Sequence, residues 1–161
     1  MGCVRIRTFA TCAIAAALTL CGSVLIAAED GHASPVFTAK QADAGRTAYA
    51  ENCATCHMPD LSGNNEKPPL AGETFMSTWG ARSTKDLLDY MSGAMPFGGP
   101  SLDADTYLSL TAYVLQSNGA LAGSVALTSS TAVRIGSLPC AVAATTSIEQ
   151  PCAAKAGVTT H

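Results

Sequence analysis

Charged and aromatic side chains are scarce in this sequence of 161 residues. Only 13% of the residues are charged, 6% are aromatic, and the formal net charge is −3. A nucleic-acid-binding protein usually carries a strongly basic surface, so this composition argues against that class. The length fits one domain with an additional tail rather than two domains. Cysteine is better represented, with 7 residues that fall into early, middle and late groups along the chain.

The early cysteines lie in a segment with the pattern of a secretory signal peptide. Arg5 and Arg7 precede an uncharged stretch that ends in small residues at Ala28. A basic start, an apolar centre and a small-residue exit are typical of cleaved signals. We therefore expect residues 1–28 to be a signal peptide that directs the protein to the periplasm, with Ala33 as a second possible cleavage point. The alternative is an uncleaved membrane anchor, since about 20 apolar residues can span a bilayer.

Capping residues and apolar periodicity predict an all-α domain with three helices. Gly45 and Tyr49, four residues apart, share one face of the first helix, and the glycine lets another helix approach closely. Loop-forming residues dominate between the first and second helices. The predicted helices cover residues 39–52, capped by Thr38 with Gln41, then 85–92, capped by Ser83, and 104–117, capped by Asp103.

Residues 120–161 differ in composition from the helical domain at 38–119. They are mostly Ala, Ser, Thr, Val and Gly, without aromatic residues, which predicts a poorly ordered tail. Cys140 and Cys152 lie in this tail, and an even pair of cysteines in an oxidising compartment is expected to form a disulfide. We expect that bond to be a local clip, so truncation after Gly119 should leave the stability of the helical domain nearly unchanged.

The middle cysteines belong to the sequence Cys53-Ala-Thr-Cys56-His57, which has the C-x-x-C-H pattern of covalent haem attachment. The two thiols would bond to the vinyl groups of the porphyrin, and the histidine would coordinate the iron. A thioredoxin-like redox pair would require a βαβ unit, and a zinc site would require a second, closely spaced ligand pair. A helical domain this small also needs a covalent or metal-based staple. We therefore expect one covalently bound haem c.

The second axial ligand of the iron must come from a residue far from His57 in the sequence. We favour Met95, because Pro96 disfavours a helical conformation for it and nearby glycines allow the backbone to lie close to the ring. Met76 is the reserve candidate, whereas Met91 fits the helix core. The candidates considered are His32, His161, Met58, Met76, Met91 and Met95.

Together these motifs resemble the class I cytochromes c, in particular the small monohaem cytochromes associated with periplasmic dehydrogenases. The resemblance covers residues 38–119 and implies a cytochrome c-like three-helix fold around one haem, in which Gly45 and Tyr49 meet Leu110 and Tyr113. It rests on Gly45-x-x-x-Tyr49, Cys53-Ala-Thr-Cys56-His57, Pro68-Pro69-Leu70-Ala71-Gly72, Met95-Pro96 and Leu110-Thr-Ala-Tyr113-Val114-Leu115.

The resemblance also implies particular roles near the haem. The carbonyl of Pro68 would hold the His57 ring, Leu70 would pack on the haem, and Trp79 would neighbour a haem propionate. The set of expected cofactor-binding residues is Cys53, Cys56, His57, Met95, Pro68, Leu70 and Trp79, with His57 and Met95 on the iron.

Iron with two protein ligands has no open position for a substrate, which favours a one-electron carrier over an enzyme. The expected partners are redox proteins: a periplasmic dehydrogenase as donor and an oxidase or another cytochrome as acceptor. Membrane association is expected only if the N-terminal segment is retained. The alternative function is a haem-based catalyst or sensor in which Met95 is labile.

Overall fold

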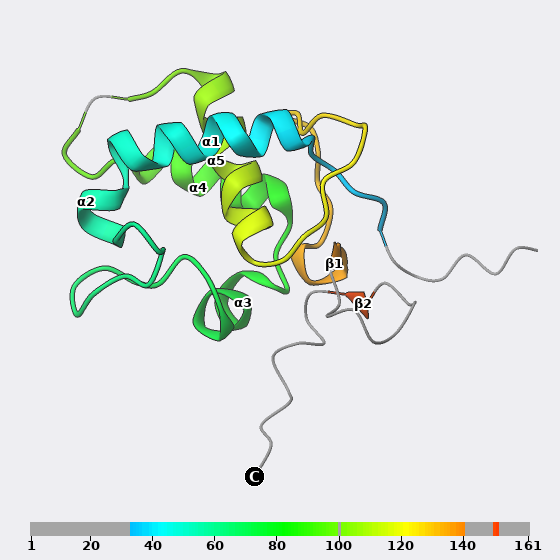
Figure 1. Ribbon diagram of the computed structural model, residues 1–161, viewed down its shortest axis with the longest axis horizontal. Helices are drawn as coiled ribbons and strands as arrows, with labels where there is room; N and C mark the ends of the chain where they lie inside the picture. Colours follow the sequence, from blue (N-terminus) through cyan, green and yellow to red (C-terminus); the bar gives the residue numbers. More distant parts are fainter. Residues whose placement is uncertain (1–32, 100, 141–149, 152–161) are drawn as a thin grey trace, which may run out of the picture.

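Helices dominate the computed structural model, which describes residues 33–99, 101–140 and 150–151 (Figure 1). This agrees with the predicted all-α class. The first and last predicted helices are present with the expected limits, and the one between them is longer than 85–92. The elements are α1 (Ala39–Asn52), α2 (Ala54–His57), α3 (Glu73–Trp79), α4 (Thr84–Ala94), α5 (Ala104–Ser117), the 3₁₀ helix η1 (Ile135–Ser137), and strands β1 (Pro139–Cys140) and β2 (Gln150–Pro151).

Helices α2 and α3 were not part of the three-helix prediction. They have 4 and 7 residues, and neither has a side chain that caps its N-terminus. Without a capping residue or several turns of apolar periodicity, a short helix leaves little signal in a sequence. Tertiary contacts around the loop-rich segment between α1 and α4 therefore decide where these two helices form.

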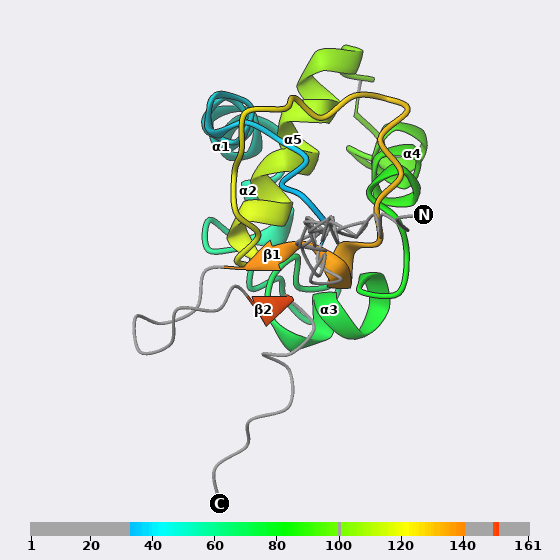
Figure 2. The same cartoon turned by 90° about the vertical axis from the view of Figure 1, so that its right-hand side faces the viewer.

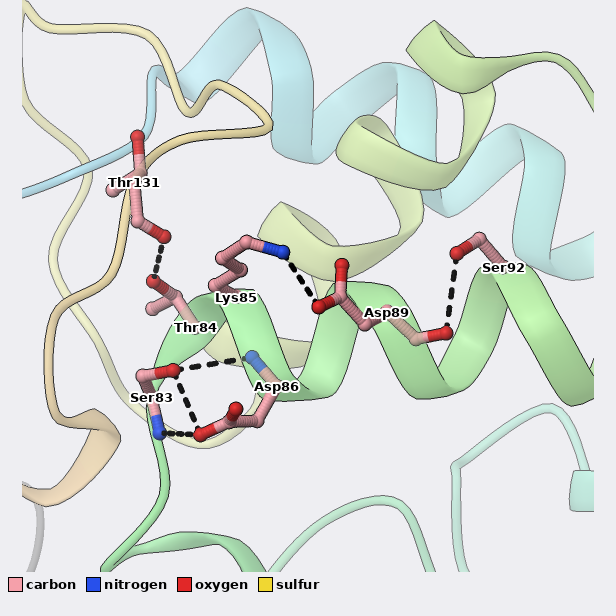
Figure 3. A network of polar contacts seen from close by, with 7 residues as sticks. All are labelled: Ser83, Thr84, Lys85, Asp86, Asp89, Ser92 and Thr131. Atoms are coloured by element: carbon pink, nitrogen blue, oxygen red, sulfur yellow. Dashed lines mark hydrogen bonds and ion pairs between the residues drawn. The ribbon is translucent and has the colours of Figure 1, made fainter.

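Side-chain caps begin the three longer helices, as the sequence predicts. In α1 the Gln41 backbone N–H donates to Thr38 Oγ1 at 3.2 Å, and the Thr38 N–H donates to Gln41 Oε1 at 3.2 Å. In α4 the same reciprocal pair joins Ser83 and Asp86, as Figure 3 shows. The backbone N–H and the hydroxyl of Ser83 lower the pKa of Asp86, so the carboxylate form is the one that caps α4. Asp103 accepts a bond from the Thr106 N–H at the start of α5.

The crossing of α1 and α5 forms the centre of the fold (Figures 1 and 2). A Cβ atom at Gly45 would lie 1.9 Å from the Ser109 carbonyl oxygen, so only glycine allows the helices to approach this closely. One turn further along α1, the ring of Tyr49 lies 5.3 Å from that of Tyr113. The predicted meeting of the first and last helices is therefore present.

Residues 120–140, here named the strap, run from the end of α5 past the starts of α1 and α4 (Figure 2, yellow to orange). The prediction of a poorly ordered tail is wrong for this part of the chain. Leu127, Ile135 and Leu138 are only 3%, 2% and 1% exposed. Their spacing has no helical or strand period, so the strap could not be recognised as part of the core from periodicity.

Hydrogen bonds to the beginnings of two helices hold the strap in place. The Gln41 side chain donates to the Leu127 carbonyl at 2.9 Å and accepts from the Leu127 N–H at 2.8 Å. At α4, the buried Thr84 hydroxyl donates to the Thr131 carbonyl at 2.7 Å (Figure 3). The same hydroxyl accepts a bond from the Val133 N–H. These contacts satisfy polar groups of the strap that would otherwise be buried without partners.

Two predictions about the chain ends fall largely outside the described residues. The expected signal peptide at 1–28 and the cysteine at position 152 are not among them. Strand β1 pairs with β2 in an antiparallel register that places Cys140 opposite Gln150. Across residues 33–99, 101–140 and 150–151, no helix combines the length and the apolar character needed to cross a bilayer.

Candidate haem-binding site

The attachment motif lies at the sharp junction between α1 and α2. Cys53 ends α1 and begins α2, and its carbonyl accepts bonds from the N–H groups of Cys56, at 3.1 Å, and His57, at 2.9 Å. This single turn places the two thiols and the imidazole on one short, hydrogen-bonded segment. Neither Cys53 nor Cys56 is in a disulfide, and Cys53 is half-buried while Cys56 is exposed. Burial raises the pKa of the Cys53 thiol, and the neighbouring Cys56 adds to this effect.

The imidazole of His57 is buried and oriented by a carbonyl. It is 7% exposed, and its Nδ1 lies 3.1 Å from the carbonyl oxygen of Pro68. The carbonyl can only accept, so this contact requires the proton on Nδ1 and leaves the lone pair of Nε2 available for a metal. The contact is the one that the resemblance to class I cytochromes c implies.

The loop after α2 is folded so that Pro68 returns to His57. The Gly63 N–H donates to the His57 carbonyl at 3.1 Å, and the Leu70 N–H donates to the Leu61 carbonyl at 2.9 Å. The Asn64 side chain donates to the carbonyl of Cys56 at 3.1 Å and accepts two N–H groups from its own turn. Asn64 was not among the predicted site residues, although its position after Gly63 marks a turn.

Met95 lies where the sequence predicts, in extended backbone directly after α4. Its side chain is half-buried, and its carbonyl accepts a bond from the hydroxyl of Tyr107 at 2.6 Å. A cavity of about 420 Å³ is lined by residues 92–99, Ser101 and Tyr107. Tyr107 was not among the predicted site residues, so its role as an anchor of the Met95 loop was missed.

The Met95 loop and the Pro68 loop lie next to each other. The ammonium group of Lys67 is 5.7 Å from the centre of the Phe97 ring, a cation–π distance. Lys67 directly precedes the proline that contacts His57, and Phe97 is two residues beyond Met95. The fold therefore places the loop that contacts His57 next to the segment that carries Met95, although His57 and Met95 are 38 positions apart in the sequence.

The other candidate ligands occupy different environments. Met91 is half-buried in α4, with its sulfur 4.0 Å from the Thr111 hydroxyl of α5, which fits the core role predicted for it. Met76 is half-buried in α3 against the hydrophobic core, and Met58 is 37% exposed next to His57. His32 and His161 lie outside the described residues.

Trp79 stands in an aromatic and cationic cluster. Its ring is 5.4 Å from that of Tyr90 and 6.4 Å from that of Phe75, and the guanidinium carbon of Arg82 lies 4.9 Å from it. Leu70, the other residue expected to contact the haem, is half-buried and packs against the hydrophobic core. Arg82 was not among the predicted site residues, so its stacking on Trp79 was missed.

The donor atoms of Cys53, Cys56 and His57 have the chemistry that a covalently attached haem requires. Two unbonded thiols stand on one helical turn, and the adjacent imidazole has its Nδ1 engaged and its Nε2 lone pair available. When bound, a haem supplies an iron that gains and loses one electron. The fold and the site thus define a small helical protein with a haem-attachment motif.

Two comparisons by sequence agree with this class, and one solved structure is also similar in part. Residues 40–114 match the family model for subunit III of the cbb3-type cytochrome c oxidase. Photosystem II extrinsic protein V from Synechococcus sp. (strain CC9902) is 30% identical over 79 residues, which are 48% of this chain and 46% of that protein. The sulfane dehydrogenase SoxCD from Paracoccus pantotrophus is 28% identical with a TM-score of 0.43, over 53% of this chain and 45% of the other.

The matches by sequence support a small class I c-type cytochrome domain over residues 40–114. The chain spans about half the length of the curated relative that it matches. The cytochrome c family implies a covalently bound haem c, and its members are electron carriers rather than enzymes.

Proposed function

We infer that this protein is an exported one-electron carrier with a single haem c, bound through Cys53 and Cys56 and coordinated by His57 and Met95. The observation that carries this proposal is the 3.1 Å contact between His57 Nδ1 and the Pro68 carbonyl oxygen. It orients the ring and fixes the tautomer whose Nε2 can coordinate iron. The single C-x-x-C-H motif in the sequence supports one haem.

The surroundings of Met95 support its role as the second axial ligand. The bond from Tyr107 holds the Met95 backbone, while the side chain remains half-buried in the loop next to the Pro68 segment. A thioether is a neutral, soft ligand that favours reduced iron, so the pair of His57 and Met95 predicts a raised reduction potential. With both axial positions held by protein, the site transfers electrons with little rearrangement of its ligands.

The proposed partners are a periplasmic dehydrogenase as donor and an oxidase or another cytochrome as acceptor. The family model matched by residues 40–114 takes its description from an oxidase subunit, which supports a place in a respiratory chain. Export to the periplasm rests on the signal-like pattern of residues 1–28. N-terminal sequencing of the mature protein distinguishes cleavage after Ala28, cleavage after Ala33 and retention of the segment.

The covalent bond to the haem provides the direct test of this function. We expect haem to stay with the polypeptide through acid-acetone extraction and denaturing electrophoresis of protein made in a host that matures c-type cytochromes. Cys53→Ser and Cys56→Ser should each sharply lower the yield of haem-bound protein, whereas Ser62→Ala, at an exposed position in the following loop, should not. Haem that is freely extracted from the wild-type protein would overturn the proposal.

We also propose a disulfide between Cys140 and Cys152. The pairing of Pro139 with Pro151 brings the residue before each cysteine side by side, which supports the bond. Thiol labelling of the exported, denatured holoprotein is expected to find no reactive thiol, because the remaining cysteines of the mature chain would be in thioethers. Two reactive thiols per haem would show instead that the late cysteines are not joined.

A further inference from the structure

Asn118, at the C-terminal end of α5, makes a bidentate contact with the loop that carries Pro68. Its side-chain amide donates to the Leu70 carbonyl at 2.9 Å, and its side-chain oxygen accepts from the Gly72 N–H at 2.9 Å. The same amide group also donates to the Val114 carbonyl of its own helix at 2.8 Å. One side chain therefore joins the end of α5 to two backbone groups that lie nearly fifty positions earlier in the chain.

Only a short and stiff segment separates this contact from the His57 ring. The chain from Leu70 back to Pro68 passes through Pro69, and the rings of both prolines fix their φ angles. The Leu70 N–H is bonded to the Leu61 carbonyl at 2.9 Å, so Leu70 is held through both its N–H and its carbonyl. A displacement of Leu70 would accordingly be transmitted to the Pro68 carbonyl that contacts His57.

We propose that Asn118 is a positioning residue for the His57 imidazole, acting through Leu70 and Pro68. This rests on the proposed function, in which His57 binds the iron. A hydrogen bond from Nδ1–H to a carbonyl raises the electron density of the ring and makes it a better ligand for oxidised iron. By holding the Pro68 carbonyl in place, Asn118 contributes to a lower reduction potential than a free loop would give.

The asparagine side chain suits this task because it presents a donor and an acceptor at once. Leucine has a similar size and removes both contacts, whereas aspartate keeps an acceptor for the Gly72 N–H but offers no donor to the Leu70 carbonyl. Ser117 supplies a matched control, because it is exposed and its hydroxyl donates to the Tyr113 carbonyl within α5. Ser117→Ala therefore alters the same helix end without a change at the Pro68 loop.

The experiment uses the haem-loaded full-length chain and compares three variants with the wild type. Asn118→Leu should raise the midpoint potential, shift the NMR resonances of the His57 ring, and speed hydrogen exchange of the Gly72 amide about tenfold, the effect of losing one hydrogen bond of ordinary strength. Asn118→Asp should keep slow exchange at Gly72 but still shift the His57 resonances. Ser117→Ala should match the wild type in all three measurements.

A wild-type potential together with wild-type His57 resonances in Asn118→Leu would overturn this inference. If that variant does not accumulate with haem, unchanged His57 resonances in Asn118→Asp would overturn it equally. Failure of the proposed function looks different, because the wild-type protein itself would then lack covalent haem or a histidine ligand.

Discussion

At the scale of single residues, the site depends on side chains held by their backbone neighbours. The backbone carbonyl of Met95 accepts a hydrogen bond from the Tyr107 hydroxyl. The imidazole of His57 is oriented by the backbone carbonyl of Pro68. These anchors reduce the number of conformations that the two proposed ligand residues can adopt before haem binds, which favours binding.

Replacement of Met95 tests the proposed axial pair. Met95→Ala should abolish the weak near-infrared band of sulfur-to-iron coordination in the ferric protein, because the thioether is lost. Met91→Ala is the matched control: it should keep the band and lower the melting temperature, since Met91 packs against Thr111 in the core. Met76→Ala should keep the band as well. Loss of the band in the Met91 variant, with retention in the Met95 variant, would move the ligand into α4.

The residue pattern was sufficient to predict the loop position of Met95, because it depends on the proline that follows and on nearby glycines. The residue pattern was insufficient for Tyr107, Asn64 and Asn118, because the side chain of each one bonds to backbone groups of a distant segment or of a turn. A tyrosine on the apolar side of a helix gives the same sequence signal whether or not its hydroxyl finds a carbonyl.

At the scale of elements, the close crossing of α1 and α5 should be the most sensitive contact. Gly45→Ala would place a Cβ atom 1.9 Å from the Ser109 carbonyl oxygen, and a backbone atom cannot move aside as a flexible side chain can. We expect the free energy of unfolding to fall by about 1–3 kcal/mol, the usual range for an overpacked core. Denaturant unfolding of the holoprotein measures this loss.

Gly93 provides the control for the crossing. It lies inside α4, and a Cβ atom there would have no atom within 4 Å other than those of its chain neighbours and its own helix backbone. Gly93→Ala should raise the free energy of unfolding by about 0.4–1 kcal/mol, because alanine restricts the unfolded chain. Similar effects of the two substitutions would contradict the close approach of the helices at Gly45.

The capped helices could be predicted from the sequence because their start signals are local. Thr38 with Gln41 and Asp103 with Thr106 form bonds over three residues, and the structure shows both. Helix α3 begins after Gly72 without a side-chain cap, so nothing local marked it. Elements stabilised by their own residues were predicted, and elements stabilised by the rest of the fold were not.

At the scale of the whole molecule, the strap makes residues 120–140 part of the domain rather than an appendage. Truncation after Gly119 removes Leu127, Ile135 and Leu138 and leaves Thr84 without its partners. We now expect the melting temperature of the holoprotein to fall by roughly 10 °C or more, since each kcal/mol shifts it by about 4–8 °C in a domain of this size.

Removal of residues 153–161 alone is the control for that truncation, and the composition of this end predicts little change in the melting temperature. Equal melting temperatures for the wild type and the protein truncated after Gly119 would contradict a structural role of the strap. A lower melting temperature with an unchanged visible spectrum would show that the strap stabilises the domain but does not affect the surroundings of the haem.

The bonds between Gln41 and Leu127 have a consequence for the order of folding during synthesis. They join residues 86 positions apart, so the Gln41 side chain at the start of α1 can reach its final partner only after most of the domain has been synthesised. Closing so long a loop is slow compared with forming a local turn. Cys53, Cys56 and His57 therefore precede the strap in the order of synthesis, and the local turns of α1 and α2 can form before Gln41 reaches Leu127.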